Sequence, residues 1–109
     1  MSEERNKPIA LTSGVDYQSG SIVSRVIHKG KGGNVTLFAF DGGQELSEHT
    51  SPFTAILQVL EGDADVTVGD SSSKVQAGEL IVLPQDVPHS VSATSQFKML
   101  LTLLTHKKV

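Results

Sequence analysis

The chain has 109 residues, of which 38% are hydrophobic and 19% charged, and its net charge is -3. This length suits one domain with a single core and is too short for two. The mild negative charge, with a basic cluster only at residues 106–108, excludes the basic surface that nucleic-acid binding requires. The absence of cysteine excludes disulfide bonds, thiolate metal sites and a cysteine nucleophile.

The first eight residues, MSEERNKP, are polar and do not resemble a secretory signal. No apolar run approaches the roughly 20 residues that a membrane helix needs. We therefore expect no membrane partner and a cytoplasmic location. The division that we expect is an N-terminal arm at residues 1–20, followed by a single domain at residues 21–109.

The first expected strands form a hairpin. Residues 21–29 are rich in β-branched side chains, which favour strands. The sequence GKGGN at residues 30–34 supplies glycines that accept positive φ and predicts a turn into a second strand at residues 35–40.

Periodicity leaves two later segments open. Residues 53–60 fit a strand, but their apolar residues also recur at the spacing of a helix face. The closing segment at residues 97–106 offers either period as well. Context must decide between strand and helix for both segments.

The clearest strand is residues 64–68, where Ala64, Val66 and Val68 alternate with polar residues. Beyond it we expect a polar turn at residues 69–73 and a short strand at residues 74–76. Two further apolar strands follow, at residues 78–84 and 89–93. Short apolar runs about ten residues apart, with Gly, Pro or Ser turns between them, predict an all-β sandwich or barrel.

Two stretches each carry one histidine, His49 and His89, beside an apolar run. The second stretch resembles the second motif of the cupin superfamily, which runs glycine, five residues, proline, one residue, glycine, two residues, histidine, three residues, asparagine. Gly78, Pro84 and His89 match this pattern, while Asp86 and Ala93 replace its second glycine and its asparagine.

The first stretch resembles the first cupin motif at His49 and Gly62. The resemblance covers roughly residues 21–104. It implies an all-β fold, a double-stranded β-helix or jelly roll of two antiparallel sheets around a central pocket. It also implies a homodimer, since small cupins commonly dimerise and subunit pairing can cover the edges of the sheets.

The resemblance further implies a metal site of three histidines and one glutamate, but two of these positions are changed. Ser47 occupies the position of the first histidine. The glutamate position falls on Thr54 when counted forward from His49, and on Ala55 when counted back from Gly62. Two neutral imidazoles lack the ligand number and the negative charge that usually hold a divalent transition metal.

The remaining candidates lie around the two histidines. Strand alternation predicts that Ser47 shares a side with His49, so that both would face His89 in one pocket. If a metal binds weakly through His49 and His89, Gln44 or Glu45 on the upstream loop would have to add ligands.

Three functions remain open on this sequence. The first is a cupin that binds an unidentified small molecule without metal, through hydrogen bonds from Ser47, His49 and His89. The second is a metal-dependent enzyme of dioxygenase or isomerase type, which needs at least three protein ligands. The third is a structural or regulatory dimer with a vestigial pocket. The missing carboxylate favours the first of these.

Overall fold

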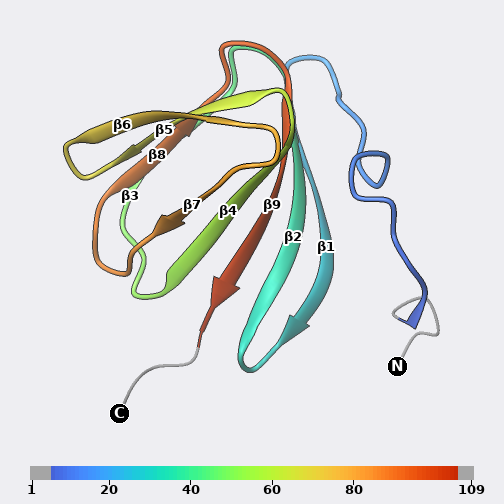
Figure 1. Cartoon of the computed structure of the whole chain (residues 1–109), viewed down its shortest axis with the longest axis horizontal. Helices are drawn as coiled ribbons and strands as arrows, with labels where there is room; N and C mark the ends of the chain where they lie inside the picture. The colour runs from blue at the N-terminus through green and yellow to red at the C-terminus, as the bar shows by residue number, and fades with distance from the viewer. Residues whose placement is uncertain (1–5, 106–109) are drawn as a thin grey trace.

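The computed structural model describes residues 6–105, and these residues form nine β-strands in two antiparallel sheets (Figure 1). The strands are β1 (Ile22–Gly30), β2 (Gly33–Phe40), β3 (Glu45–His49), β4 (Thr54–Glu61), β5 (Asp63–Val68), β6 (Ser71–Gln76), β7 (Leu80–Leu83), β8 (His89–Ser92) and β9 (Phe97–Leu104).

The larger sheet has the strand order β1-β2-β9-β4-β7 and the smaller sheet the order β3-β8-β5-β6. Neighbouring strands are often distant in sequence: β9 lies between β2 and β4, and β8 lies between β3 and β5. This is the arrangement of a jelly roll, and the predicted double-stranded β-helix of two antiparallel sheets is confirmed.

Both segments that periodicity left open are strands. In β4, the buried residues Ala55, Leu57 and Val59 alternate with more exposed neighbours, which is the period of two that a strand requires. The helical spacing of the other apolar residues arises because Ile56 and Leu60 lie on the outer face of the same sheet. A strand in the middle of a sheet, with apolar side chains on both faces, imitates a helical pattern.

The predicted polar turn at residues 69–73 is wrong for its second half. The turn comprises Gly69 and Asp70, and Ser71 already begins β6. Ser72 pairs with Thr67 across the two strands, and their hydroxyl oxygens lie 2.9 Å apart. Residues 71–73 are serines on the exposed edge strand β6. They pair through their backbone but have no apolar side chains, so their sequence resembles that of a turn.

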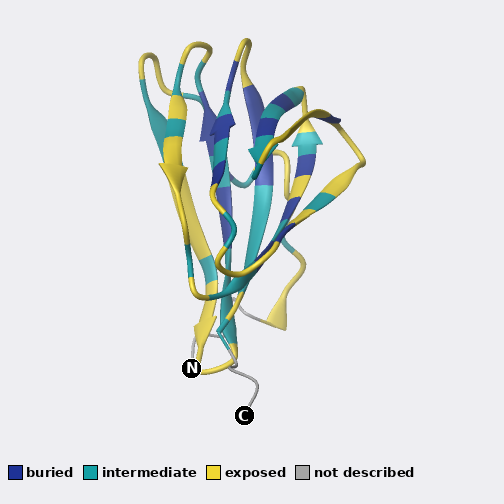
Figure 2. Cartoon of the chain, turned by 90° about the vertical axis from the view of Figure 1, so that its left-hand side faces the viewer, coloured by how far each residue is buried: buried dark blue, intermediate teal, exposed yellow. Residues whose placement is uncertain are grey.

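The interior is filled mainly at one end of the barrel. Phe40 and Phe97 are fully buried and stack with their ring centroids 4.5 Å apart, and Met99 is buried in the same cluster. In Figure 2 the buried segments gather in the upper part of the molecule, whereas the lower part is intermediate or exposed. One end is therefore closed by packed side chains, and the interior of the other end is less completely buried.

The N-terminal arm lies against the outer face of the larger sheet. Val15 is buried with Leu37 and Ala39 on that face. Lys98, also buried there, donates a hydrogen bond to the carbonyl oxygen of Thr12. The described part of the predicted arm thus packs on the domain, while residues 1–5 lie outside the described residues.

Residues 106–109, at the end of the predicted domain, also lie outside the described range. Between residues 6 and 105 there is no helix long and apolar enough to cross a membrane.

Candidate functional site

The two histidines singled out in the sequence meet in the structure. His49 at the end of β3 and His89 at the start of β8 are register partners across the smaller sheet. Their Nε2 atoms lie 3.1 Å apart, and the rings meet edge to face with centroids 4.4 Å apart. His89 is 6% exposed, whereas His49 is exposed. His89 is therefore buried, whereas His49 is accessible to solvent.

A β-bulge in β3 brings His49 to this position. Leu46 is opposite Val91 and His49 is opposite His89, so three steps along β3 correspond to two steps along β8. Cross-strand partners share a face of a sheet, and Val91 and His89 both point inward. The extra residue in β3 therefore lets Leu46 and His49 face the interior although an odd number of steps separates them.

The backbone fixes which nitrogens of the pair remain available. The Nδ1 of His49 lies 2.8 Å from the carbonyl oxygen of Ser47, and the Nδ1 of His89 lies 3.3 Å from that of Val87. A carbonyl oxygen can only accept, so each Nδ1 carries the hydrogen. In the neutral rings both Nε2 atoms are then hydrogen-bond acceptors that face each other. Neither can satisfy the other without a shared proton or a third group.

The loops on either side of the pair are joined to each other. The amide of Asp86, in the loop before His89, donates to the carbonyl oxygen of Ser51, in the loop after His49, at 2.7 Å. Asp86 has a positive φ of 63°, a conformation that aspartate tolerates better than most residues. Glycine adopts positive φ without strain, which explains why the second cupin motif has glycine at this position.

The environment of His89 disfavours its charged form. Burial lowers the pKa of His89 below its ordinary value of 6.5, and the nearby His49 acts in the same direction. The contact with the carbonyl oxygen of Val87 opposes these two effects. A neutral His89, with its Nε2 as an acceptor, is therefore favoured down to a lower pH than for a free imidazole.

Comparisons with known proteins agree with this fold and these motifs. The family model described as a cupin domain matches residues 36–104, which is more than half of the chain. The chain belongs to the cupin family.

Solved structures similar to this cupin include the following three. A conserved protein of unknown function from Streptococcus pyogenes has a TM-score of 0.87 and 31% identity, over 94% of this chain and 90% of that one. A cupin superfamily protein from Desulfitobacterium hafniense has a TM-score of 0.86 and 22% identity, over 92% of each chain, and supports the fold alone.

The third, a cupin 2 conserved barrel domain protein from Leptotrichia buccalis, has a TM-score of 0.82 and 37% identity. The match covers 86% of this chain but 46% of that one. No curated protein is similar enough to this cupin to count as a match.

The structure separates the two candidates for the glutamate position. Ala55 is 5% exposed and points into the interior, in the same cluster as Leu57 and Val59. Thr54, one residue earlier, pairs with Leu104 and faces outward. The inward position that corresponds to the glutamate of metal-bearing cupins therefore carries a methyl group.

Ser47 contributes to the site through its backbone, and not through its side chain as its sequence position had suggested. The bulge interrupts the alternation on which the expected pairing of Ser47 with His49 depended. Ser47 is exposed, and what it brings to the pair is its carbonyl oxygen, which accepts from the Nδ1 of His49. The carbonyl oxygens of Ser47 and Val87 were not apparent in the sequence, since any residue provides such an atom.

Gln44 and Glu45 lie at the other end of β3 from His49. Glu45 is opposite Ser92, and the carbonyl oxygen of Gln44 accepts from the amide of Ala93. Within residues 6–105 there is no group of three His, Cys, Asp or Glu side chains that could hold a metal ion. Two nitrogens 3.1 Å apart could be adjacent ligands of one ion, but the two imidazoles have no carboxylate beside them. The donor set does not fit a tightly held resident metal.

Apolar side chains line the interior of the barrel. The inward residues Phe38, Leu46, Leu101 and Leu103 are only partly buried, in contrast to the fully buried Phe97 and Met99 at the closed end. The barrel thus combines two polar acceptors with an interior lined by apolar side chains, which are the two components of a typical small-molecule site.

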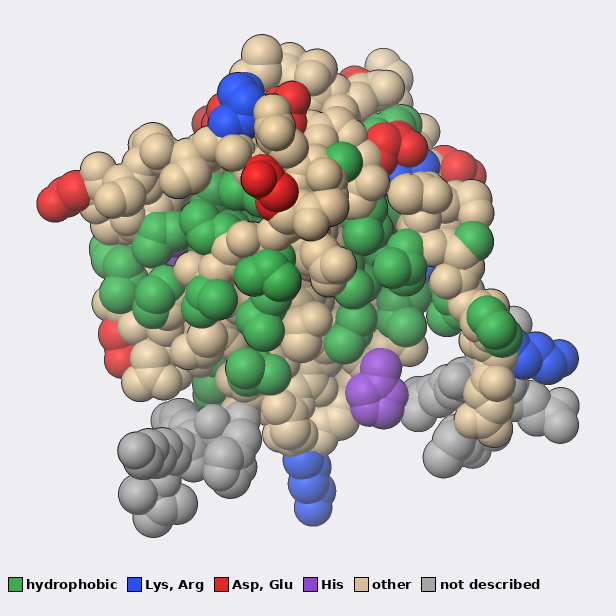
Figure 3. Space-filling model, viewed as in Figure 1, with side chains coloured by type: hydrophobic (Ala, Val, Ile, Leu, Met, Phe, Trp, Pro, Cys, Tyr) green, Lys and Arg blue, Asp and Glu red, His purple; other side chains and the backbone are tan. Residues whose placement is uncertain are grey.

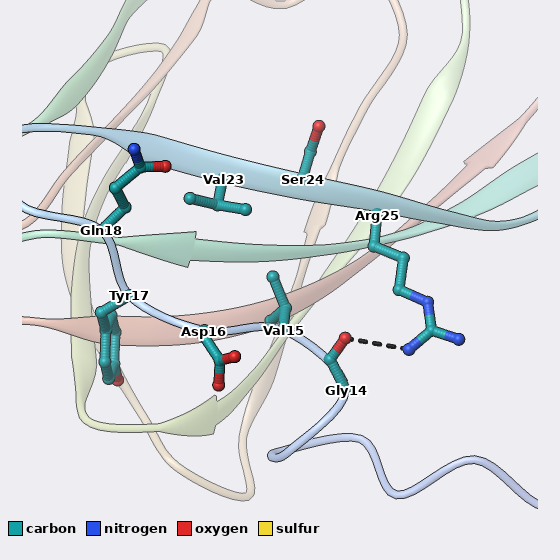
Figure 4. A pocket seen from close by; sticks show the side chains of 8 residues that line it. All are labelled: Gly14, Val15, Asp16, Tyr17, Gln18, Val23, Ser24 and Arg25. Carbon is teal, nitrogen blue, oxygen red and sulfur yellow. Dashed lines mark hydrogen bonds between the residues drawn. The ribbon is translucent and has the colours of Figure 1, made fainter.

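A separate pocket of about 450 Å³ lies between the N-terminal arm and β1 (Figure 4). Figure 4 shows Arg25 reaching from β1 toward the arm, where its Nη1 donates to the carbonyl oxygen of Gly14 at 3.0 Å. The side chains of Asp16 and Tyr17 point away from β1 in this view. Because its polar side chains do not converge, we regard this pocket as the gap beneath a docked arm. The histidine pair remains the candidate site.

Proposed function

We propose that this cupin binds a small molecule that donates a hydrogen bond to the His49–His89 pair. One observation carries the proposal: both Nδ1 atoms face carbonyl oxygens, so that two Nε2 acceptors face each other 3.1 Å apart. A hydroxyl or amine hydrogen supplied by a ligand would satisfy acceptors that cannot satisfy each other.

Two features limit the class of ligand: the apolar interior of the barrel and the lowered pKa of His89. Phe38, Leu101 and Leu103, which are partly buried in the interior of the barrel, favour a ligand with an apolar body. The lowered pKa of His89 keeps its ring neutral, which favours a donor over an anion at neutral pH. We therefore propose a compact phenol or alcohol rather than a sugar phosphate or a dicarboxylate.

A matched pair of probes tests this proposal. Phenol and its methyl ether, anisole, differ in the hydrogen that can be donated. In ¹⁵N-labelled protein we expect phenol to shift the Nε2 resonances of His49 and His89, and anisole to leave them nearly unchanged. His89→Gln should weaken phenol binding roughly tenfold, the cost of about one hydrogen bond. His28→Gln, a substitution of an exposed histidine on β1, provides the control.

Two results would contradict the proposal. The first is equal binding of phenol and anisole, which would show that the acceptors do not recognise the ligand. The second is a stoichiometric metal ion in protein purified without chelator, with His49 and His89 among its ligands. The second result would favour a metal-dependent enzyme instead.

A further inference from the structure

The inner face of β2 changes from apolar to polar along its length. Phe40 belongs to the hydrophobic core near the closed end of the barrel, and Phe38 packs against it. Thr36 and Asn34 continue the same row, because side chains two residues apart on a strand share a face. The register agrees: Thr36 is opposite Leu101 of β9, which also packs against the core. Both polar residues are therefore on the interior side of the larger sheet.

The hydroxyl group of Thr36 is buried without a partner. Thr36 is 9% exposed, yet no described residue forms a hydrogen bond with its side chain. Among residues 6–105, no completely enclosed side-chain oxygen or nitrogen lacks a partner. The hydroxyl oxygen of Thr36 therefore borders space that a water-sized group can enter. A hydroxyl group removed from bulk water is stabilised by a hydrogen bond, so this position suits a polar group of a bound molecule.

Strand counting places Thr36 at about the same depth in the barrel as His89. Both β2 and β8 run toward the closed end (Figure 1), where the amide of Gly43 donates to the carbonyl oxygen of Ala93 at 2.7 Å. Thr36 lies four residues before the end of β2, and His89 three residues before the end of β8. The difference is one residue, or about 3.4 Å along a strand. Packed sheets are about 10 Å apart, a separation that a small molecule can span.

We infer that the ligand is held at both ends, by the His49–His89 pair on the smaller sheet and by the hydroxyl group of Thr36 on the larger sheet. The inference rests on the proposed function, since it places one end of the ligand on the histidine pair. A threonine hydroxyl group both donates and accepts hydrogen bonds, which suits a second hydroxyl group. The ligand class that follows is a compact diol, with its two hydroxyl groups at opposite ends of an apolar body.

The second polar group of the ligand carries no charge. Strands β2 and β8 contain no Asp, Glu, Lys or Arg, and the charged residues of β4 and β9, Glu61 and Lys98, lie beside the arm on the outer face. Figure 3 shows hydrophobic side chains gathered over β7, β4 and β2, with charged side chains around them. A carboxylate or ammonium group beside Thr36 would be buried without a counter-ion, which is costly.

Two phenols of similar shape test the inference. 4-Hydroxybenzyl alcohol has a second hydroxyl group opposite the phenol, and 4-ethylphenol has a methyl group in its place. Both are titrated into ¹⁵N-labelled protein and followed at the Nε2 resonances of His49 and His89. Thr36→Val should weaken the binding of the alcohol at least fivefold relative to that of 4-ethylphenol, because only the alcohol loses a hydrogen bond. Thr36→Ser retains the hydroxyl group and should retain the ratio of the two affinities.

Thr102→Val is the matched control. Thr102 lies on β9 of the same sheet, opposite Ile56 on the outer face, and its substitution should leave both affinities unchanged. Thr36→Ala repeats the test if Thr36→Val does not fold. A ratio of affinities that does not depend on the hydroxyl group of Thr36 would overturn the inference and assign this group to water only. Failure of both phenols to shift the resonances of the histidine pair in the unaltered protein would instead overturn the proposed function, and this inference with it.

Discussion

The glycines of this chain differ in how strictly their positions exclude a side chain. Gly62, between β4 and β5, has a φ of 75°, and a Cβ at this position would lie 2.4 Å from the carbonyl oxygen of Gln96. Gly78, between β6 and β7, has a φ of 90°, but a Cβ there would meet nothing within 4 Å. Both were matched to motif glycines in the sequence. In the structure, positive φ favours glycine at both positions, but only Gly62 also lacks room for a Cβ.

We predict that Gly62→Ala destabilises the fold more than Gly78→Ala does. Gly78→Ala should cost about 1 to 2 kcal/mol, the strain of a side chain at positive φ. Gly62→Ala adds a collision with backbone, which cannot be relieved by a change of rotamer. Urea unfolding of both variants measures the difference, and equal losses would show that the loop at Gln96 yields easily.

At this scale the sequence predicted the pairing of His49 with His89 but not the contribution of Ser47. The motifs specify which residue type stands at each position, and this information was enough to locate both histidines and the changed glutamate position. The bulge between Leu46 and His49 is a property of the pairing of two strands. No residue type in β3 predicts this bulge. Strict alternation therefore placed the side chain of Ser47 beside His49, whereas in the structure it is the carbonyl oxygen of Ser47 that contacts His49.

Among the elements, the N-terminal arm is held by one buried cation. The Nζ of Lys98 in β9 donates to the carbonyl oxygen of Thr12, lies 4.9 Å from the ring centroid of Tyr17, and is 4.0 Å from Glu61. The Tyr17 hydroxyl donates to the Oε2 of Glu61 at 2.6 Å. Burial, followed by this carboxylate, raises the pKa of Tyr17 well above its ordinary value.

We predict that Lys98→Met releases the arm while leaving the barrel folded. Methionine retains the apolar stem that packs on the sheet but loses the ammonium group that binds the arm. Limited proteolysis should then cut within residues 6–20 at least several times faster, as expected for the loss of about 1 to 3 kcal/mol. Lys74→Met, at an exposed surface pair, is the control and should be cut at the rate of the unaltered protein.

The sequence predicted most strands well and the arm poorly. The strands β1, β2, β5 and β8 were expected within about two residues, because alternation and turn residues are local signals. The start of β6 and the docking of the arm depend on partners far along the chain, such as Lys98 for Thr12. In the sequence, only Lys98 within the apolar run of β9 indicated that the outer face of this sheet contacts a polar group.

The molecule as a whole has a barrel that is packed at one end and carries its polar pair toward the other. Phe40 and Phe97 close the first end. His49 and His89 lie at the end where the loops at residues 50–53 and 84–88 meet. The fold class could be predicted from the sequence, but the uneven filling of the interior could not, since it depends on which inward residues meet across the two sheets.

We predict that the stability of the whole fold declines as pH falls below 6.5. The folded-state pKa of His89 is lower than this unfolded value, so the unfolded chain takes up a proton before the folded protein does, and acid favours unfolding. Well above pH 6.5, where the histidine is neutral in both states, it contributes no pH dependence. Chemical unfolding between pH 5 and 8 should show the decline, and His89→Gln should reduce it, whereas His28→Gln should not. A decline of equal size in His89→Gln would assign the effect to other groups.

The position of Tyr17 also gives this protein an optical property. The chain contains no tryptophan and one tyrosine, which lies in the arm against Glu61 and Lys98. The intrinsic ultraviolet emission of the unlabelled protein therefore comes almost entirely from the arm, beside a carboxylate that accepts its hydroxyl hydrogen. Emission intensity and anisotropy report whether the arm is docked, and circular dichroism reports the sheets separately. Undocking and global unfolding can thus be followed as two distinct signals without introducing a probe.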